Sequence, residues 1–195
     1  MLTSPRPPSL EQIREFVIAG HGDLGKVKQL LAECPELLNA AHQWSEKDRE
    51  TAIQAAAQVG NAPIAEYLLE NGAPLEICTA AMLGHRDDVE CLLAEDPNRI
   101  HATGAHGIPL LTHASLSGNL ELVQFLFQRG ASGGVSSALH NAVSRGYYEI
   151  VRWLLENGKP DLGWKNFQGK TALAVATERK FEGIAQLLRE HGAAE

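Results

Sequence analysis

The chain has 195 residues, 44% of them apolar and 21% charged, and a formal net charge of −7. This balance excludes a disordered chain and disfavours a general nucleic-acid binder, because phosphate contacts need clustered Lys and Arg. The 26 Ala and 26 Leu, set against an aromatic content of 6%, predict packed helices rather than a β-sandwich or barrel.

The N-terminal segment is rich in proline and has no apolar stretch of the kind found in secretory signals. We therefore expect residues 1–8 to form a disordered leader. Directly after it, Ser9 and Gln12 have the spacing of a capping box that opens a helix. No run of about 18 apolar residues follows anywhere, so no membrane span is expected. The three cysteines cannot all pair and form no CxxC motif, which favours a cytoplasmic protein.

One pattern recurs along the rest of the chain. In residues 118–131, a glycine is followed four and five places later by apolar residues, then by an apolar pair at places seven and eight, and by a second glycine at place twelve. The same frame begins at positions 22, 60, 84, 118, 146 and 180, where the last position is Lys180 instead of glycine. Repetition at this period is typical of stacked repeat proteins. It predicts one domain over residues 9–195 with six units, approximately 9–43, 44–74, 75–100, 101–134, 135–165 and 166–195.

Each unit is predicted to contain two helices separated by the glycine. The segment before it is rich in small residues, as in Ala55–Ala57, and the segment after it carries apolar residues at helical spacing. Glycine can adopt the left-handed conformation that reverses the chain after a helix. Lys180 in the same place is expected to cost about 1 kcal/mol of strain.

The sequence resembles the ankyrin repeat family. The resemblance rests on three degenerate tetrapeptides, on one Gly-His pair and on recurrent Gly-Ala ends, namely Thr51-Ala52-Ile53-Gln54, Ser137-Ala138-Leu139-His140, Thr171-Ala172-Leu173-Ala174, Gly84-His85, Gly72-Ala73, Gly130-Ala131 and Gly192-Ala193. It covers about residues 9–193 and implies an all-α solenoid of stacked helix-turn-helix units, with short loops or β-hairpins between some units. Leu75 and Pro109 stand where the family has a capping Thr, so two middle helices are expected to lack an N-cap.

The family also places a hairpin or long loop between units. Three connections here are long enough to project, at 39–50, 101–108 and 161–169. The connections near residues 74–76 and 132–136 are too short. We therefore expect three projecting loops rather than five.

Catalytic and metal-binding patterns are weak. Among eight histidines, His101, His106 and His113 are the densest group, but their spacing suits zinc poorly. A metal- or small-molecule-binding protein, or an enzyme, that uses the His101–His113 region stays as an alternative hypothesis. Carboxylates such as Asp48 and Glu50 are interpreted as solvated, and Cys78 and Cys91 as small core thiols. The six units leave no room for a catalytic domain, so we predict no enzyme activity, no catalytic residues, no cofactor and no metal.

The resemblance implies that the two residues before each unit's first glycine lie on a concave face. This strip is apolar in the middle and charged toward the C-terminal end, and apolar groups on a solvated face are typical of contact sites. Loop tips add aromatic and charged side chains, which are common interface anchors. The prediction is a monomeric module that binds a protein partner, and a purely structural or self-associating role is a second alternative. The predicted partner-binding residues are Trp44, Arg49, Val59, Met82, Leu83, His106, Leu116, Arg145, Phe167 and Arg179.

Overall fold

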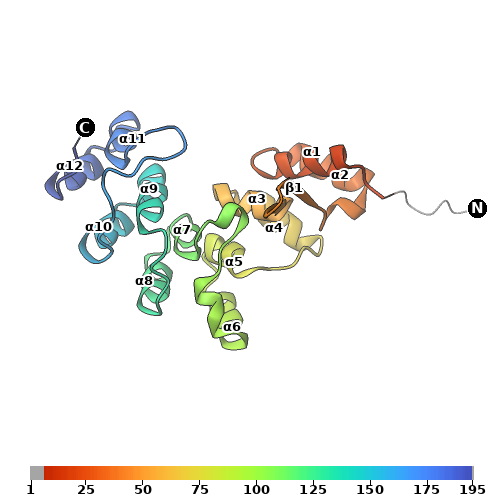
Figure 1. Cartoon of the computed structure of the whole chain (residues 1–195), viewed down its shortest axis with the longest axis horizontal. Helices are drawn as coiled ribbons and strands as arrows, with labels where there is room; N and C mark the ends of the chain where they lie inside the picture. Colours follow the sequence, from red (N-terminus) through yellow and green to blue (C-terminus); the bar gives the residue numbers. More distant parts are fainter. Residues whose placement is uncertain (1–6, 195) are drawn as a thin grey trace, which may run out of the picture.

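The computed structural model describes residues 7–194 and shows an elongated row of helix pairs with the two ends of the chain far apart (Figure 1). The predicted leader falls mostly on residues 1–6, which lie outside the described residues. The α-helices are α1 (Leu10–Gly20), α2 (Leu24–Glu33), α3 (Ala52–Val59), α4 (Ala62–Glu70), α5 (Ile77–Leu83), α6 (Arg86–Glu95), α7 (Leu110–Ala114), α8 (Leu120–Gln128), α9 (Val135–Arg145), α10 (Tyr148–Asn157), α11 (Ala172–Glu178) and α12 (Glu182–Glu190). Short 3-10 helices are η1 (Pro35–Leu37), η2 (Pro97–His101) and η3 (Ala105–Gly107), and the strands are β1 (Ala41–Ser45) and β2 (Asp48–Thr51).

Six of the twelve α-helices that the structure describes begin at a capping side chain. Ser9 and Gln12 form the predicted capping box at α1, with the Ser9 hydroxyl accepting from the Gln12 N–H. Thr51 and Gln54 form a second box at α3. Neither α5 nor α7 has a side-chain N-cap, as expected from Leu75 and Pro109. These two helices are also short, with seven and five residues.

Helix ends follow the predicted reversal. The helices α3, α5 and α9 each end at a glycine in the left-handed conformation, Gly60, Gly84 and Gly146. Lys180 takes up the same conformation with a φ of 59°, so the expected strain at this residue is present.

The helices stack in two rows. The first helix of each pair contacts the next one along the chain, which gives the row α1, α3, α5, α7, α9 and α11. In the other row, α2 contacts α4, and α10 contacts both α8 and α12. Each pair therefore buries its apolar faces against its neighbours, and the predicted all-α solenoid is confirmed.

Three connections project from the row, and we call them fingers. The first finger (residues 39–51) is the antiparallel hairpin β1–β2. The second (residues 101–109) is closed by a single bridge between Thr103 and Pro109 and contains η3. The third (residues 159–171) is a loop without strands that projects at the C-terminal end in Figure 1. The connections 71–76 and 129–134 are shorter than each of the three fingers, so the expected three projecting connections are present.

The buried apolar residues form two clusters. One is built by the first two helix pairs, and we call it the N-terminal cluster. The other runs from Ile77 through the remaining pairs. Met82 and Leu116 come from the later pairs but pack in the N-terminal cluster, so they join the two parts of the solenoid. None of the helices that the structure describes is long and apolar enough to cross a membrane.

Candidate functional site

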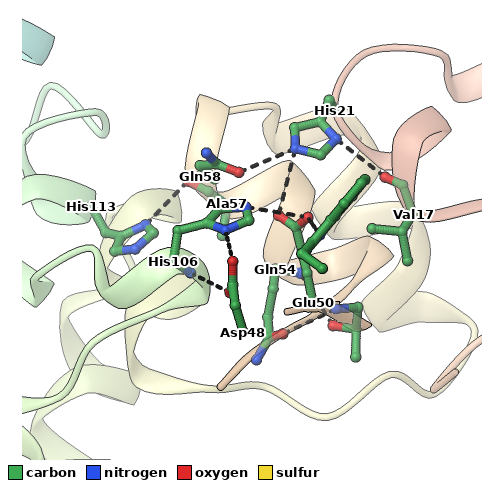
Figure 2. Close-up of polar contacts among 11 residues, drawn as sticks. Val17, His21, Asp48, Glu50, Gln54, Ala57, Gln58, His106 and His113 are labelled. Atoms are coloured by element: carbon green, nitrogen blue, oxygen red, sulfur yellow. Dashed lines mark hydrogen bonds and ion pairs between the residues drawn. The ribbon is translucent and has the colours of Figure 1, made fainter. Parts of the chain in front are cut away.

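The first and second fingers touch each other. No finger lies between them, since the connection 71–76 is short, and η3 packs against both β2 and α3. A polar cluster fills this contact and is drawn in Figure 2. We call it the finger junction and define it by His21 at the end of α1, Trp44, Asp48 and Glu50 of the hairpin, and His106 of η3.

Glu50 lies at the centre of the finger junction and is fully buried. Its Oε2 accepts a hydrogen bond of 2.7 Å from the indole N–H of Trp44. The hairpin pairing shifts between Gln43 and Ser45, and this irregularity at Trp44 accompanies the turn of its indole toward Glu50. Glu50 Oε1 has no hydrogen-bonding partner among the described residues. A buried carboxyl oxygen without a partner is costly, so the groups around Glu50 matter for the stability of the fold.

Two histidines approach this carboxylate from different elements. His21 Nε2 lies 3.5 Å from Glu50 Oε1, and His106 Nε2 lies 3.5 Å from Glu50 Oε2. The other nitrogen of His106 pairs with Asp48 Oδ2 at 2.6 Å, and the His106 backbone N–H donates to Asp48 Oδ1. The nearby Glu50 carboxyl group raises the pKa of His21, although partial burial opposes it. The cluster therefore combines a buried negative charge with two titratable rings.

Two further contacts tie later helices to α3. His113 Nδ1 lies 3.2 Å from the Ala57 carbonyl oxygen, and burial lowers the pKa of this histidine. The Arg145 guanidinium at the end of α9 donates to the carbonyls of Val59 and Gly60 at 2.5 and 3.0 Å. A cation at the C-terminal end of a helix also interacts favourably with the helix dipole. The end of α3 is therefore held by residues more than fifty positions away in the chain.

The metal-binding alternative finds no support in this geometry. Among residues 7–194, no group of three or more His, Cys, Asp or Glu side chains is arranged to hold a metal ion. The histidines of the proposed His101–His113 region point to different partners. His106 contacts the first finger, whereas His113 contacts α3.

The third finger carries one highly exposed aromatic side chain at a hydrogen-bonded tip. Asn166 Oδ1 accepts from the backbone N–H groups of Gln168 and Lys170, which shapes the tip. The ring of Trp164 packs edge-on against His140 at 5.2 Å between centroids. Phe167 projects from this fixed tip and is 96% exposed.

The finger is also anchored at both ends. The Asp161 N–H donates to Ser136 Oγ on α9, and Asp161 Oδ1 accepts from the Gly163 N–H. At the other end, Lys170 Nζ pairs with Glu178 of α11 at 2.6 Å. Contacts within the chain itself therefore hold both ends of this loop.

The predicted partner-binding residues fall into three groups. Arg49, Phe167 and Arg179 are exposed, and the Val59 side chain is 38% exposed although its carbonyl binds Arg145. Trp44 folds back onto Glu50 and keeps 37% of its surface exposed, and His106 and Arg145 are engaged in contacts within the chain. Leu83 is half-buried, and Met82 and Leu116 are buried.

The expectation that Met82 and Leu116 face solvent is wrong. Met82 is 3% exposed and Leu116 7% exposed, and both pack in the N-terminal cluster. Leu116 packs against the end of α3, where its Cβ would lie 3.3 Å from a methyl group added to Gly60. The packing of Met82 and Leu116 in the N-terminal cluster covers the middle of the strip that family resemblance places on the concave face.

Two smaller expectations also need correction. Glu50 is buried rather than solvated, because the second finger covers it. Cys78 is a buried core thiol as expected, and burial raises its pKa to about 12. Cys91 is exposed instead, because it lies on the outer side of α6.

His21 is the residue of the finger junction that sequence reasoning missed. Its position after α1 carries no motif, and its partner Glu50 lies 29 places away in a polar run. The one available signal was strand alternation, which places Asp48 and Glu50 on the same face of β2. Strand alternation does not predict that the second finger covers the face of β2 that carries Asp48 and Glu50.

Comparison with known families agrees with this fold. Residues 111–195 match the family described as Ankyrin repeats (3 copies), and residues 48–80 match the one described as Ankyrin repeat. The two matches take in more than half of the chain, and the chain belongs to the ankyrin repeat family. Repeats of this family generally form non-catalytic scaffolds for protein–protein interaction.

Three curated relatives match part of this chain and are longer proteins. Ankyrin repeat and SOCS box protein 11 from Homo sapiens is 32% identical over 57% of this chain and 35% of its own length. The B-cell lymphoma 3 protein homolog of Mus musculus is 31% identical over 67% of this chain and 25% of its own length. The E3 ubiquitin-protein ligase Ufd4 of Drosophila melanogaster is 34% identical over 55% of this chain and 4% of its own length. The chain thus spans about a third or less of the length of these relatives.

Proposed function

We propose that the chain binds a protein partner through the third finger and the exposed charged residues next to it on the concave side. The observation that carries the proposal is Phe167, an aromatic side chain that is 96% exposed. The exposed phenyl ring places apolar surface in contact with water. A partner that buries this surface gains binding energy from the hydrophobic effect. Aromatic anchors of this kind often supply much of the binding energy of an interface.

Preorganisation supports the same surface. The contacts of Asp161, Trp164, Asn166 and Lys170 hold the tip in place, so binding at Phe167 orders little additional chain. A surface that is already ordered loses less entropy when a partner binds.

The charge of the finger favours an acidic partner. Lys159 and Lys165 are exposed, and Arg179 is exposed on α11. Lys170 is paired with Glu178, and Asp161 is the one acidic residue between 159 and 171. We therefore propose a partner surface with an apolar pocket and acidic residues around it, and binding that weakens as salt rises. Nucleic acid is not the proposed partner, because the net charge of the chain is −7.

We also propose that the protein acts as a monomer in the cytoplasm. Cys34, Cys78 and Cys91 are all free thiols, which supports a reducing compartment. Size-exclusion chromatography with light scattering at several protein concentrations tests the monomer, and a mass that rises with concentration would contradict it.

Photo-crosslinking tests the proposed surface directly. A photoreactive phenylalanine analogue replaces Phe167 in one variant and Leu10 in a control, since Leu10 is also highly exposed at 81% but lies at the other end of the row. A distinct protein adduct at position 167 that is missing at position 10 supports the proposal. The same adducts at both positions, or none at position 167, would contradict it.

A further inference from the structure

Glu50 has an unusual electrostatic environment. Its side chain is fully buried, and the cationic groups within 4.0 Å of it in the described part of the chain are the imidazoles of His21 and His106. The Trp44 indole also donates to it, and the Gln58 amide lies beside His21. A third histidine, His42, lies opposite Glu50 in the hairpin and packs edge-on against the Trp44 ring. No Lys or Arg of residues 7–194 pairs with Glu50. A buried carboxylate needs a counter-charge, and here histidine alone can supply it.

The hydrogen-bond geometry points to charged rings. His21 Nδ1 lies 3.2 Å from the Val17 carbonyl, and His21 Nε2 faces Gln58 Oε1 and Glu50 Oε1. His106 Nδ1 faces Asp48, and His106 Nε2 faces Glu50. All four ring nitrogens therefore face oxygen acceptors (Figure 2). A neutral imidazole has one N–H, whereas the protonated ring has two, so only the protonated form donates on both sides.

The cluster also connects three separate parts of the chain. His21 ends α1, Glu50 and Asp48 belong to the first finger, and His106 belongs to the second finger. The second finger rests on the hairpin through His106, whose ring and backbone N–H both bind Asp48. A change in the charge of the rings therefore acts on the contact between the fingers.

We propose that the finger junction is a proton-sensitive clasp, in which protonated His21 and His106 hold the second finger against the first and deprotonation releases it. This proposal is independent of partner binding at the third finger. Histidine titrates near neutral pH, so the clasp responds to physiological changes in acidity.

The direction of the effect follows from His21. Its pKa is raised by the Glu50 carboxyl group 3.5 Å away, so the folded chain binds this proton more tightly than the unfolded chain does. The stabilisation is fully present below the ordinary pKa of 6.5 and is lost as the pH rises through the raised value. His113 changes the stability with pH in the opposite direction. Burial lowers its pKa, so folding is favoured when this histidine is neutral. The pH dependence of the unmodified chain therefore mixes both effects, and a comparison of variants is needed.

The experiment compares the full chain with Glu50→Gln at about pH 6 and about pH 8, where histidine is mostly charged and mostly neutral. Gln has nearly the shape of Glu and can still accept from Trp44, but it offers no charge to the histidines. The matched control is Asp88→Asn, which removes the exposed pair between Asp88 and His85. Hydrogen–deuterium exchange of residues 101–109, corrected for intrinsic rates, reports release of the second finger.

We expect the second finger to exchange about tenfold more slowly in the unmodified chain than in Glu50→Gln at the lower pH, and at similar rates at the higher pH. Asp88→Asn should match the unmodified chain at both values. An equal difference between Glu50→Gln and the unmodified chain at both values would overturn the proposal. If Glu50→Gln does not fold, His106→Gln replaces it, with the same expected loss of pH dependence and the same refuting result.

Discussion

The contact between Arg145 and the end of α3 should couple two residues that lie 85 positions apart. Gly60 has a φ of +70°, and a methyl group added there would lie 2.5 Å from Arg145 Nη2 and 3.3 Å from Leu116 Cβ. The guanidinium is the flexible end of a side chain, so we expect it to move away. Gly60→Ala therefore costs both the backbone strain and the Arg145 hydrogen bonds.

The magnitudes follow from these two terms. A left-handed Ala costs about 1 kcal/mol. The charge-assisted bonds from Arg145 contribute about 1 kcal/mol after allowance for solvent exposure. We expect Gly60→Ala to lower the free energy of unfolding by about 2 kcal/mol, Arg145→Ala by about 1 kcal/mol, and the double variant by about 2 kcal/mol rather than about 3.

Urea unfolding followed by circular dichroism measures all four members of this cycle. Gly169→Ala is the matched control, because Gly169 has a φ of +73° and nothing within 4 Å of an added methyl group. It should cost about 1 kcal/mol, with or without Arg145. Additive losses in the Gly60 cycle, to within about 0.3–0.5 kcal/mol, would refute the contact between Arg145 and α3.

Three further predictions concern single side chains. Met82→Ala should lower the free energy of unfolding by about 2–5 kcal/mol in urea titrations because the side chain is buried. A loss of under about 0.5 kcal/mol would show that Met82 is exposed to solvent. A thiol reagent at neutral pH should label exposed Cys91 readily and leave Cys78 unlabelled in the folded chain, since burial raises the pKa of Cys78 to about 12. Mass spectrometry measures the labelling of each cysteine, and equal labelling of the two would contradict this prediction. Lys180→Gly should raise the free energy of unfolding by about 1 kcal/mol because it relieves a φ of 59°, and a destabilised variant in the same titration would show that the strain is compensated.

The helix pairs could be predicted because their signals are local. The frame over residues 118–131 places an apolar face at helical spacing, and α8 forms there. Ser9 and Gln12 are three positions apart, so their capping box can be read from the sequence alone. The lengths of the connections likewise predicted which of them project as fingers.

The burial of individual residues could not be predicted, because it depends on contacts between distant units. Met82 occupies a position that family resemblance assigns to an open face, yet it is buried in the N-terminal cluster together with Leu116. Glu50 lies in a polar run that predicts solvation, and the second finger with His106 buries it. Leu116 and His106 are each more than thirty residues away from these positions, and no periodic pattern encodes that distance.

The proposed binding surface is tested most directly by the affinity of a partner captured at position 167. Isothermal titration compares the unmodified chain with Phe167→Ala and with the exposed control Leu10→Ala. We expect Phe167→Ala to weaken binding about tenfold or more, while Leu10→Ala leaves the affinity unchanged and all three proteins unfold at the same urea concentration. Equal affinities for Phe167→Ala and the unmodified chain would contradict the assignment of the third finger as the binding surface.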